Sequence, residues 1–546
     1  MRLDYFAVLA ERAAMAPARW RRPFLAWLDG IERGWAIPLL IAAFAAAWWL
    51  FLVIAYQSGD LHADVLETWS LGREFAWGNA KHPPLMGWVA WLWTRIFPLT
   101  DWSFQLLSMT NTAVALFAVD LIARRFVRGD SRAIVLMLLM LTPVYQFYAQ
   151  RFNANTVLLA IWPLATYCYL RSFETRSIGW SIAAGALAAL AMLGKYYSVF
   201  LVASLAFAAV AHPRRAVYFR SWAPWLSTLS GLVVLGPHLH WLATTGAQPF
   251  DYAMAHHGNL GLDHSLRAAL MFVLGIAAAL ALPAIAWTLS AGRRLSRFAA
   301  DFRAMEPGLV LLFWIFIGTI VFPMVTAVAI GSDMPSLWAA QGLFLPVVLV
   351  VCGAGFTLER FFTVNLATWV AGIAIIAVVV AAPVHAAYRN GIAPNERTYY
   401  RLAAAELTKR WHEATGRPML QVSGDDGLAF AAAFYSPDHP RYSRPFQFQY
   451  TWNSPRPVTL QRGWVGVCFA TDMACTAWMD RVAGIEPDHR RVAFEVLPSL
   501  WGQPGIPTTI FALMVLPRVA QAGEPAGTPE DTVDEFSSSR RQPSEP

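Results

Sequence analysis

Long apolar stretches alternate with short polar loops along most of this 546-residue chain. Most of them approach the roughly 20 residues that an α-helix needs to cross the hydrocarbon core of a bilayer. The pattern therefore predicts an α-helical polytopic membrane protein with about eleven transmembrane helices. The expected spans are residues 35–56, 103–124, 133–150, 155–171, 178–194, 196–212, 222–243, 266–289, 308–328, 338–356 and 364–386.

The composition agrees with this pattern, because 57% of the residues are hydrophobic and only 14% are charged. Soluble domains contain about 25% charged residues. The 25 tryptophans suit a protein with wide membrane–water interfaces, where amphipathic rings settle. The net charge of +7 does not indicate a nucleic-acid partner, since the arginines fall in short loops between apolar stretches. These loops instead report the orientation of the spans.

The apolar segment 84–98 decides the orientation, because it is short and contains Arg95 near its end. If it does not cross and the N-terminus is cytoplasmic, the basic clusters fall on the cytoplasmic side, as the positive-inside rule requires. We therefore expect 84–98 to lie in, or re-enter, the outer interface. The loop 57–102 then faces the periplasm. The cytoplasmic clusters are Arg19, Arg21, Arg22 and Arg33; Arg124, Arg125, Arg128 and Arg132; Arg171 and Arg176; Arg214, Arg215 and Arg220; Arg293, Arg294, Arg297 and Arg303; and Arg360.

The composition changes near residue 389, after which short strand-like and helix-like stretches alternate. We expect a small α/β domain there, on the periplasmic side, with strands near 419–422, 464–469 and 510–516 and a helix at 428–435. Cys468 and Cys475 could form a disulfide in the periplasm or remain thiols. The expected organisation is a cytoplasmic segment 1–34, a transmembrane domain 35–389, a periplasmic domain 390–518 and a disordered tail 519–546.

Two carboxylates follow the first span in the outer loop. Asp64 and Glu67 are three residues apart and would share one face of a helix. A carboxylate beside the membrane surface can act as a general base if it reaches the proton that it removes. The alternative is a solvated helix face without a role. The clustering of other polar residues at the same depth favours the functional interpretation.

Three cations are predicted near the same surface. Lys81 and His82 follow in the first outer loop, where they could hold a phosphate group or simply contact anionic lipid headgroups. Lys195 lies between two spans, at the edge of the hydrocarbon, where an ionisable residue is costly and tends to be functional. It could also extend its side chain to the interface without a specific role.

Other outer loops supply further polar candidates for binding a substrate. Asn155 lies in the second outer loop, Tyr196 follows Lys195, and His256 and His257 lie in the fourth. Adjacent histidines suggest a metal site, but neighbouring side chains often point apart. We therefore predict no metal site.

Several of these stretches resemble glycosyltransferase family 39 in their order and spacing. They are Asp64 with His82-Pro83-Pro84-Leu85, then Asn155 to Trp162, Leu193 to Tyr196, and Asp333 to Pro346. The family includes bacterial enzymes that are like protein O-mannosyltransferases and the aminoarabinose transferase that modifies lipid A. The resemblance covers roughly residues 35–390 and extends faintly into the C-terminal domain.

The resemblance implies the GT-C membrane fold and a polyprenyl-phosphate sugar donor. It also implies inverting transfer to a hydroxyl of a glycolipid, glycan or protein at the outer face of the bacterial inner membrane. Asp64 would take the place of the catalytic carboxylate, while Lys81, His82 and Lys195 would neutralise the departing phosphate. Glu67, Asn155, Tyr196, His256 and His257 would contact the sugar or the acceptor. No cofactor and no required metal are expected.

Two positions depart from the family pattern. Val65 stands where an acidic residue commonly follows the first Asp, and Asn155 stands where an Asp is usual. Asn can donate and accept hydrogen bonds but cannot take up a proton. The departures leave open a specialised or impaired enzyme. Two further alternatives also stay open. One is a transporter or flippase for a lipid-linked or anionic substrate, which many apolar spans would also suit. The other is a non-catalytic scaffold whose terminal domain binds a partner.

Overall fold

The computed structural model describes residues 22–57, 60–73, 75–79, 81–245, 249–250, 261–332, 335–390, 396–442, 461–486 and 488–517. The chain forms two compact units, each built from several segments. The helical unit comprises Met1–Phe51, Trp77–Leu85 and Gln105–Val379. The sheet unit comprises Leu52–Ala76, Met86–Phe104 and Val380–Pro546, so it joins parts of the loop 57–102 to the C-terminal residues.

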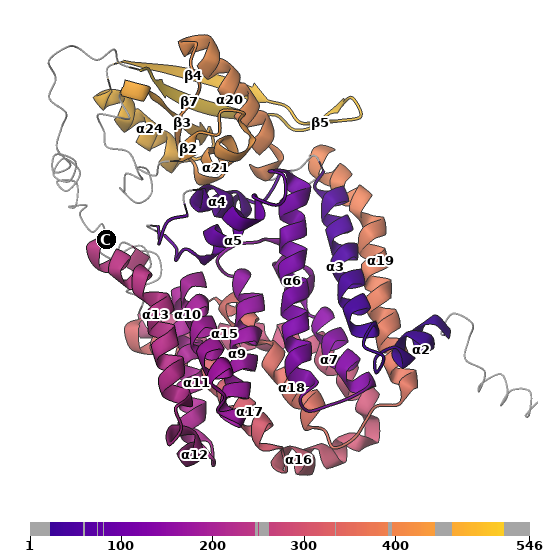
Figure 1. The fold of residues 1–546 in the computed structure, drawn as a ribbon. Helices are drawn as coiled ribbons and strands as arrows, with labels where there is room; N and C mark the ends of the chain where they lie inside the picture. Colours follow the sequence, from indigo (N-terminus) through magenta and orange to yellow (C-terminus); the bar gives the residue numbers. More distant parts are fainter. Residues whose placement is uncertain are drawn as a thin grey trace, which may run out of the picture. The chain divides into compact units, whose positions relative to one another are not determined.

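Helices occupy each of the eleven stretches that the hydrophobic pattern predicts (Figure 1). Three of the stretches are interrupted by a break or begin with a 3-10 turn. The helices are α3 Ala36–Ala55; α6 Asp101–Ala123; α7 Asp130–Met140 with α8 Pro143–Gln146 and η2 Tyr148–Gln150; α9 Val157–Thr175; α10 Ile178–Gly194; η3 Tyr196–Ser198 with α11 Val199–Ala211; α13 Ala223–Thr244; α15 Leu262–Ala291; α17 Pro307–Ile330; η5 Ser336–Gly342 with α18 Phe344–Gly353; and α19 Arg360–Asn390.

Five of the described helices are long and apolar enough to cross a membrane by themselves: α3, α6, α15, α17 and α19. A sixth span results if α7 and residues 143–150 are counted together across their 74° bend. Other apolar helices are shorter, such as α10 with its 17 residues. The prediction of a multi-pass helical membrane protein is confirmed, although several of the eleven predicted stretches form helices that are shorter or less apolar than a full span.

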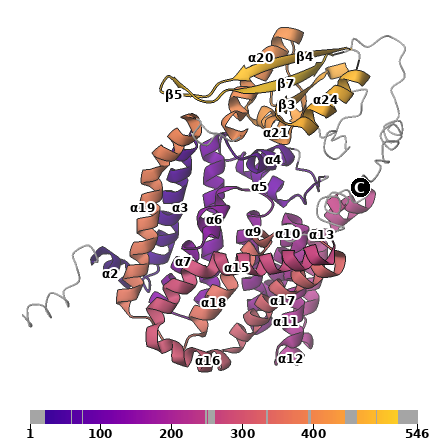
Figure 2. The ribbon, with the colours of Figure 1, turned by 180° about the vertical axis from the view of Figure 1, so that it is seen from behind.

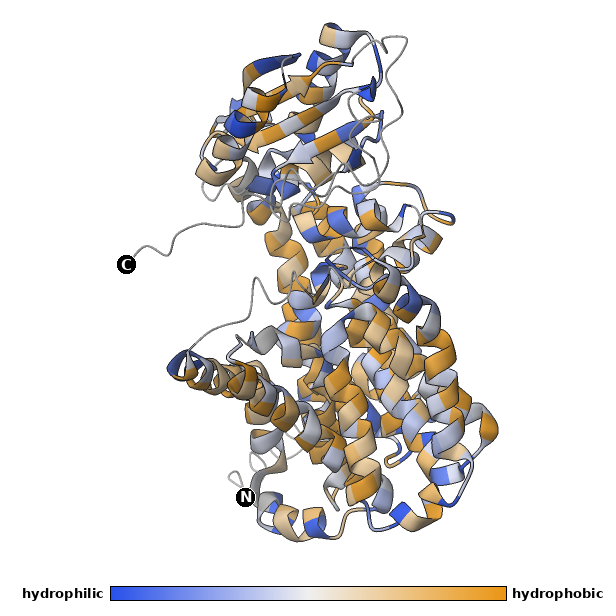
Figure 3. Cartoon of the chain, turned by 90° about the vertical axis from the view of Figure 1, so that its left-hand side faces the viewer, coloured by the Kyte–Doolittle hydropathy of each residue, from blue (hydrophilic) through white to orange (hydrophobic). Residues whose placement is uncertain are grey.

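Small residues allow the central helices of the helical unit to pack closely. α10 packs against both α9 and α13 (Figures 1 and 2). A side chain at Gly185 would collide with the backbone carbonyl of Ser227, so the backbones of α10 and α13 touch at this point. Ser227 also donates its hydroxyl to the carbonyl of Ser181 at 2.8 Å. Such contacts are the usual way in which helices associate within lipid. Figure 3 shows that apolar residues predominate along the helices of the helical unit.

Ion pairs join the helix ends that carry the basic clusters. Arg125, which follows α6, bonds Glu174 of α9 at 3.1 Å and Glu306, just before α17, at 2.9 Å. Arg132 of α7 bonds Asp120 of α6 through two contacts of 2.9 and 2.6 Å. These arginines belong to the segments that the sequence assigns to the cytoplasm. Their acidic partners connect four helices at one end of the helical unit.

The sheet unit contains a five-stranded sheet in the order β2-β1-β3-β7-β4. β1 runs parallel to β2 and β3, whereas β7 is antiparallel to β3 and β4. The small α/β region that the sequence predicts is therefore confirmed, including its helix at 428–435. The elements are α20 Tyr400–Thr415, β1 Gln421–Gly424, α21 Asp426–Tyr435, β2 Arg441–Tyr442, β3 Trp464–Phe469, α24 Met473–Ile485, β4 His489–Val496 and β7 Thr508–Val515, with a small β5–β6 hairpin at Ser499–Leu500 and Gln503–Pro504.

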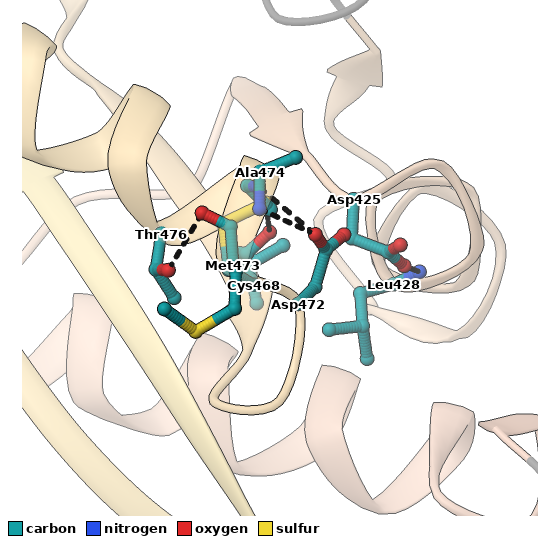
Figure 4. Close-up of a disulfide and its surroundings, with 9 residues drawn as sticks. Asp425, Leu428, Cys468, Asp472, Met473, Ala474 and Thr476 are labelled. Atoms are coloured by element: carbon teal, nitrogen blue, oxygen red, sulfur yellow. Dashed lines mark hydrogen bonds between the residues drawn. A yellow bond between two sulfur atoms is a disulfide. The ribbon is translucent and has the colours of Figure 1, made fainter.

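A disulfide joins strand β3 of this sheet to the helix α24. Cys468 and Cys475 are fully buried, and their Cα atoms are 5.7 Å apart. The sequence left open whether these two cysteines pair, and the structure has them bonded. Asp472 begins α24 by accepting the backbone N–H groups of Ala474 and Cys475, each at 3.0 Å (Figure 4). The disulfide thus fixes the first turn of a capped helix against the sheet.

Candidate active site

Two short helices shape the loop 57–102, α4 at Ala63–Gly72 and α5 at Leu85–Trp93. Their backbones meet where a side chain at Gly72 would collide with the carbonyl oxygen of Gly87. Thr68 adds a contact from its hydroxyl to the sulfur of Met86 at 3.4 Å. Within the segment 84–98 the structure has a helix, the shorter α5. It packs against the helix that carries Asp64.

Asp64 lies in the first turn of α4, where the helix dipole favours a negative charge. Nδ1 of His62 accepts the backbone N–H of Asp64 at 3.2 Å and lies 3.6 Å from its carboxylate. These contacts exclude each other, because a nitrogen that accepts a hydrogen bond carries no proton to share with the carboxylate. The Asp64 side chain is 42% exposed, so a substrate hydroxyl could approach it.

Glu67 differs from Asp64 although both lie on α4, because Glu67 is only 5% exposed. Burial, together with the nearby carboxylates of Glu67 and Asp425, raises the pKa of Tyr442 well above its ordinary value. Tyr442 donates its hydroxyl to Asp426 at the start of α21. Glu67 therefore lies near residues of the C-terminal sheet. Asp64 is the more accessible of the two carboxylates.

Lys81 and His82 lie in a turn that Asn79 organises. The amide oxygen of Asn79 accepts the backbone N–H groups of Lys81 at 3.0 Å and of His82 at 2.7 Å. Asn favours such turns because its side chain imitates a backbone carbonyl. Pro83 and Pro84 follow and restrict the chain direction into α5. Both cationic side chains are partly exposed, as binding to a phosphate group requires.

Asn155 contacts residues from two other loops of the helical unit. Its side-chain oxygen accepts a hydrogen bond from Lys195 Nζ at 2.6 Å, and its backbone carbonyl accepts one from Gln341 at 2.9 Å. The Lys195 ammonium group also lies 5.6 Å from the ring centre of Trp338. Asn155 and Lys195 thus lie together. Gln341 joins them from a distant part of the sequence.

A hydrogen-bonded chain runs from Tyr196 to the loop that carries Lys81 and His82. The Tyr196 hydroxyl lies 3.0 Å from Nε2 of His238, and Nδ1 of His238 lies 2.6 Å from the carbonyl oxygen of Trp77. An Nδ1–H donor to this carbonyl would leave Nε2 to accept from the tyrosine. His238 is buried on α13. His238 is not among the residues predicted from the sequence, although a histidine directly after Gly236-Pro237 within an apolar stretch is a signal that could have identified it.

The predicted site residues therefore divide between the two units. Lys81, His82, Asn155, Lys195 and Tyr196 belong to the helical unit, whereas Asp64 and Glu67 belong to the sheet unit. His256 and His257 lie outside the described residues. Within the part of the chain that the structure describes, no three His, Cys, Asp or Glu side chains are grouped so that they could hold a metal ion.

Residues 81–241 match the family described as dolichyl-phosphate-mannose-protein mannosyltransferase. The matched region contains His82–Leu85, Asn155–Trp162 and Leu193–Tyr196, three of the stretches on which the sequence resemblance rests. No curated protein sequence matches the chain significantly.

Two solved structures share the fold over most of the chain. ArnT from Cupriavidus metallidurans bound to undecaprenyl phosphate is 13% identical, with a TM-score of 0.55 over 88% of this chain and 98% of that protein. The apo state of the same protein gives a TM-score of 0.52 with the same identity and coverage. At this identity the likeness shows the fold alone. Taken with the family match, it confirms the resemblance found in the sequence and indicates a multi-pass membrane glycosyltransferase.

Proposed function

We propose that this protein transfers a sugar from a polyprenyl-phosphate donor to an acceptor hydroxyl at the periplasmic face of a bacterial inner membrane, with inversion. The observation that carries the proposal is the junction of Lys195 and Asn155 within the residues that match the mannosyltransferase family. This contact holds the Lys195 ammonium group in place within the unit that contains the apolar helices. The lipid carrier that we propose is undecaprenyl phosphate, which the ArnT structure contains.

The donor side of the reaction needs positive charge. As the bond between the anomeric carbon and the phosphate oxygen breaks, negative charge grows on the phosphate, and cations held in place beforehand stabilise it. Lys195 is held by Asn155, while Asn79 fixes the turn that presents Lys81 and His82. We assign these three cations to the departing polyprenyl phosphate. The isoprenoid remains in the bilayer against the apolar helices.

The acceptor side needs a base opposite the leaving phosphate, since inversion requires the incoming oxygen to approach from the other face of the sugar. We assign this role to Asp64, which is accessible at the start of α4. Asn155 can hydrogen-bond a hydroxyl but cannot take its proton, so the mechanism uses one carboxylate. We propose Glu67, Tyr196, His256 and His257 as further contacts to sugar or acceptor.

The acceptor class can be identified together with the sugar by mass spectrometry of envelope glycolipids, glycans and glycoproteins in a deletion strain and its parent. We expect the deletion to remove one sugar from one of these classes. The wild-type chain should restore it, and Asp64→Asn should not. Asp480→Asn is the matched control, because Asp480 is an exposed carboxylate on α24 that pairs with Arg491 at 2.7 Å.

Two results would contradict the proposal. One is full complementation by a stably inserted Asp64→Asn variant. The other is movement of an unaltered lipid-linked substrate across proteoliposomes that contain the purified protein, which would favour a transporter. Labelling a cysteine at position 64 with a membrane-impermeant maleimide tests the periplasmic placement separately.

A further inference from the structure

A buried carboxylate precedes the helix that carries Asp64. Asp60 is only 1% exposed, and both of its carboxylate oxygens bond the same residue of the terminal domain. Oδ2 accepts the backbone N–H of Arg401 at 2.7 Å, and Oδ1 accepts its Nε–H at 3.1 Å. Arg401 is the second residue of α20, where backbone N–H groups have no partner within the helix. Asp60 therefore caps α20 from another part of the chain and pairs with its arginine.

The same guanidinium also reaches the far end of the loop. Arg401 forms an ion pair through Nη2 with Asp101, the first residue of α6. Asp60 stands where the first outer loop begins and Asp101 where it ends. The planar fork of an arginine can bond two carboxylates at once, which a lysine ammonium group matches poorly. The Arg401 side chain of the terminal domain thus connects the two stems of the loop, its first stem at Asp60 and its second at Asp101.

Further residues of the terminal domain contact the first stem, around Asp60. Arg397 donates Nε–H to the backbone carbonyl of Asp60 at 3.0 Å, and its guanidinium lies 4.0 Å from the ring centre of Tyr56. The hydroxyl of Tyr435 accepts the backbone N–H of Leu61 at 2.9 Å. Burial, with the nearby charges of Asp101 and Asp60, raises the pKa of Tyr435 well above its ordinary value, so this tyrosine stays neutral.

The terminal domain also packs on α4 itself. Trp69 meets Phe434 of α21 edge to face, with ring centres 5.4 Å apart. Arg73, at the end of α4, donates to the carbonyl of Pro440 at 3.0 Å. The helix that carries Asp64 is therefore held at its entry, along its length and at its end by residues 397–440. These contacts all lie within the sheet unit.

We propose that Arg401 is a positioning residue that fixes the Asp64 loop by bridging Asp60 and Asp101, so that the terminal domain sets the geometry of the base. This rests on the proposed function, in which Asp64 accepts the proton. A displacement of about 1 Å at a reacting group can lower a rate by about 100-fold. The cations assigned to the donor phosphate belong to the helical unit. Loosening the bridge should therefore lower kcat while the KM for the donor changes little.

The variants should fall in a definite order. Arg401→Gln removes the shared cation from two carboxylates and should lower kcat most, by about 100-fold. Arg401→Lys keeps the charge but can satisfy one carboxylate well, so it should recover part of the rate. Asp60→Asn keeps a side chain that can accept the N–H of Arg401 and should give an intermediate loss. In the double variant of positions 60 and 401 the losses should not multiply, because both changes break the same link.

Hydrogen exchange tests the bridge without reference to activity. In full-length protein in detergent or nanodiscs, amides of residues 61–72 should exchange at least tenfold faster in Arg401→Gln and Asp60→Asn than in wild type. Arg410→Gln is the matched control. Arg410 lies on the same helix and bonds Glu406 at 2.8 Å, and this change should leave both exchange and kcat within about twofold of wild type.

Unchanged exchange of residues 61–72 in both Arg401→Gln and Asp60→Asn would overturn the bridge. A raised donor KM with unchanged kcat would overturn the positioning role. If Arg401→Gln does not fold, Arg401→Lys and Asp60→Asn carry the same comparison. Failure of the proposed function gives a different result. In that case the wild-type protein transfers no sugar, while residues 61–72 still exchange faster in the variants than in the wild type.

Discussion

The proposed donor site and the Asp64 loop hold their charged residues by different means. At the donor site, in the helical unit, amide side chains do so: Asn155 accepts from the Lys195 ammonium group, and Asn79 shapes the turn of Lys81 and His82. In the sheet unit, an arginine bridges Asp60 and Asp101 as full ion pairs. An amide orients a cation without cancelling its charge, whereas an ion pair cancels charge and fixes geometry. The first arrangement suits binding of a phosphate, and the second suits holding a loop in place.

The largest effect that this comparison predicts is the loss of the Lys195 charge. Lys195→Met should lower kcat/KM about 100- to 1,000-fold, as removal of one preorganised group that stabilises developing charge typically does. Lys195→Arg should retain more activity because it keeps the charge. Sugar transfer from a synthetic polyprenyl-phosphate donor in detergent measures both.

Lys409→Met is the control for that measurement, since Lys409 is an exposed lysine on α20 of the sheet unit. It should leave the rate within about twofold of wild type. Equal activity of Lys195→Met and Lys409→Met would remove Lys195 from the donor site.

A second prediction separates the units by their response to reductant. Opening the Cys468–Cys475 bond, or replacing both cysteines by Ser, should destabilise the sheet unit by about 2–3 kcal/mol, the entropic value for so short a loop. Thermal unfolding with and without reductant, followed by proteolysis within residues 396–517, measures this. Replacing Cys168 and Cys352, the buried free cysteines of the helical unit, by Ala should leave the response to reductant in place.

A third prediction concerns a carboxylate of the sheet unit that caps a helix. Asp425 accepts the backbone N–H of Leu428 at 2.9 Å, and burial raises its pKa to about 6. A raised pKa means that the folded state favours the protonated form. The stability that this group adds is therefore complete below about pH 4, falls as the pH rises to about 6, and is constant above that. The total loss should be on the order of 3 kcal/mol.

Asp425→Asn should remove this pH dependence, because the amide keeps an oxygen for the cap but does not ionise. Chemical unfolding of the purified protein between pH 4 and 7 provides the measurement. Asp472→Asn makes the same change at another helix cap, because Asp472 caps α24 (Figure 4). Its unfolding curve over the same pH range is compared with that of Asp425→Asn. If the slope in Asp425→Asn equals that of wild type, another group causes it.

Much of this architecture could be predicted from the sequence, because it follows from local patterns. Long hydrophobic stretches predicted the helices, and short, mostly apolar stretches after residue 389 predicted β1, β3 and β7. The basic residues could also be selected, since a lysine such as Lys195 at the hydrocarbon edge is conspicuous. Asp60, Asp101 and Arg401 could not, because their importance arises from contacts between residues about 300 or more positions apart. An isolated Asp near a span resembles an ordinary solvated residue until its partner is known.

The smallest predicted effect comes from a substitution that converts an amide-held lysine into an ion pair, and it is therefore the most direct test of the comparison. Asn155→Asp places a carboxylate where Lys195 Nζ now lies 2.6 Å from an amide oxygen, and so creates an ion pair. The donor phosphate would then compete with this carboxylate for the lysine. We expect the donor KM to rise about tenfold, roughly 1.4 kcal/mol, while kcat changes less. Asn155→Ala, which loses the orientation of the lysine without adding charge, should mainly lower kcat.

An increased rate of Asn155→Asp would contradict the donor-side role of position 155. Position 155 would then serve the acceptor, where a second carboxylate would assist Asp64, and the amide of the wild-type protein would limit its rate.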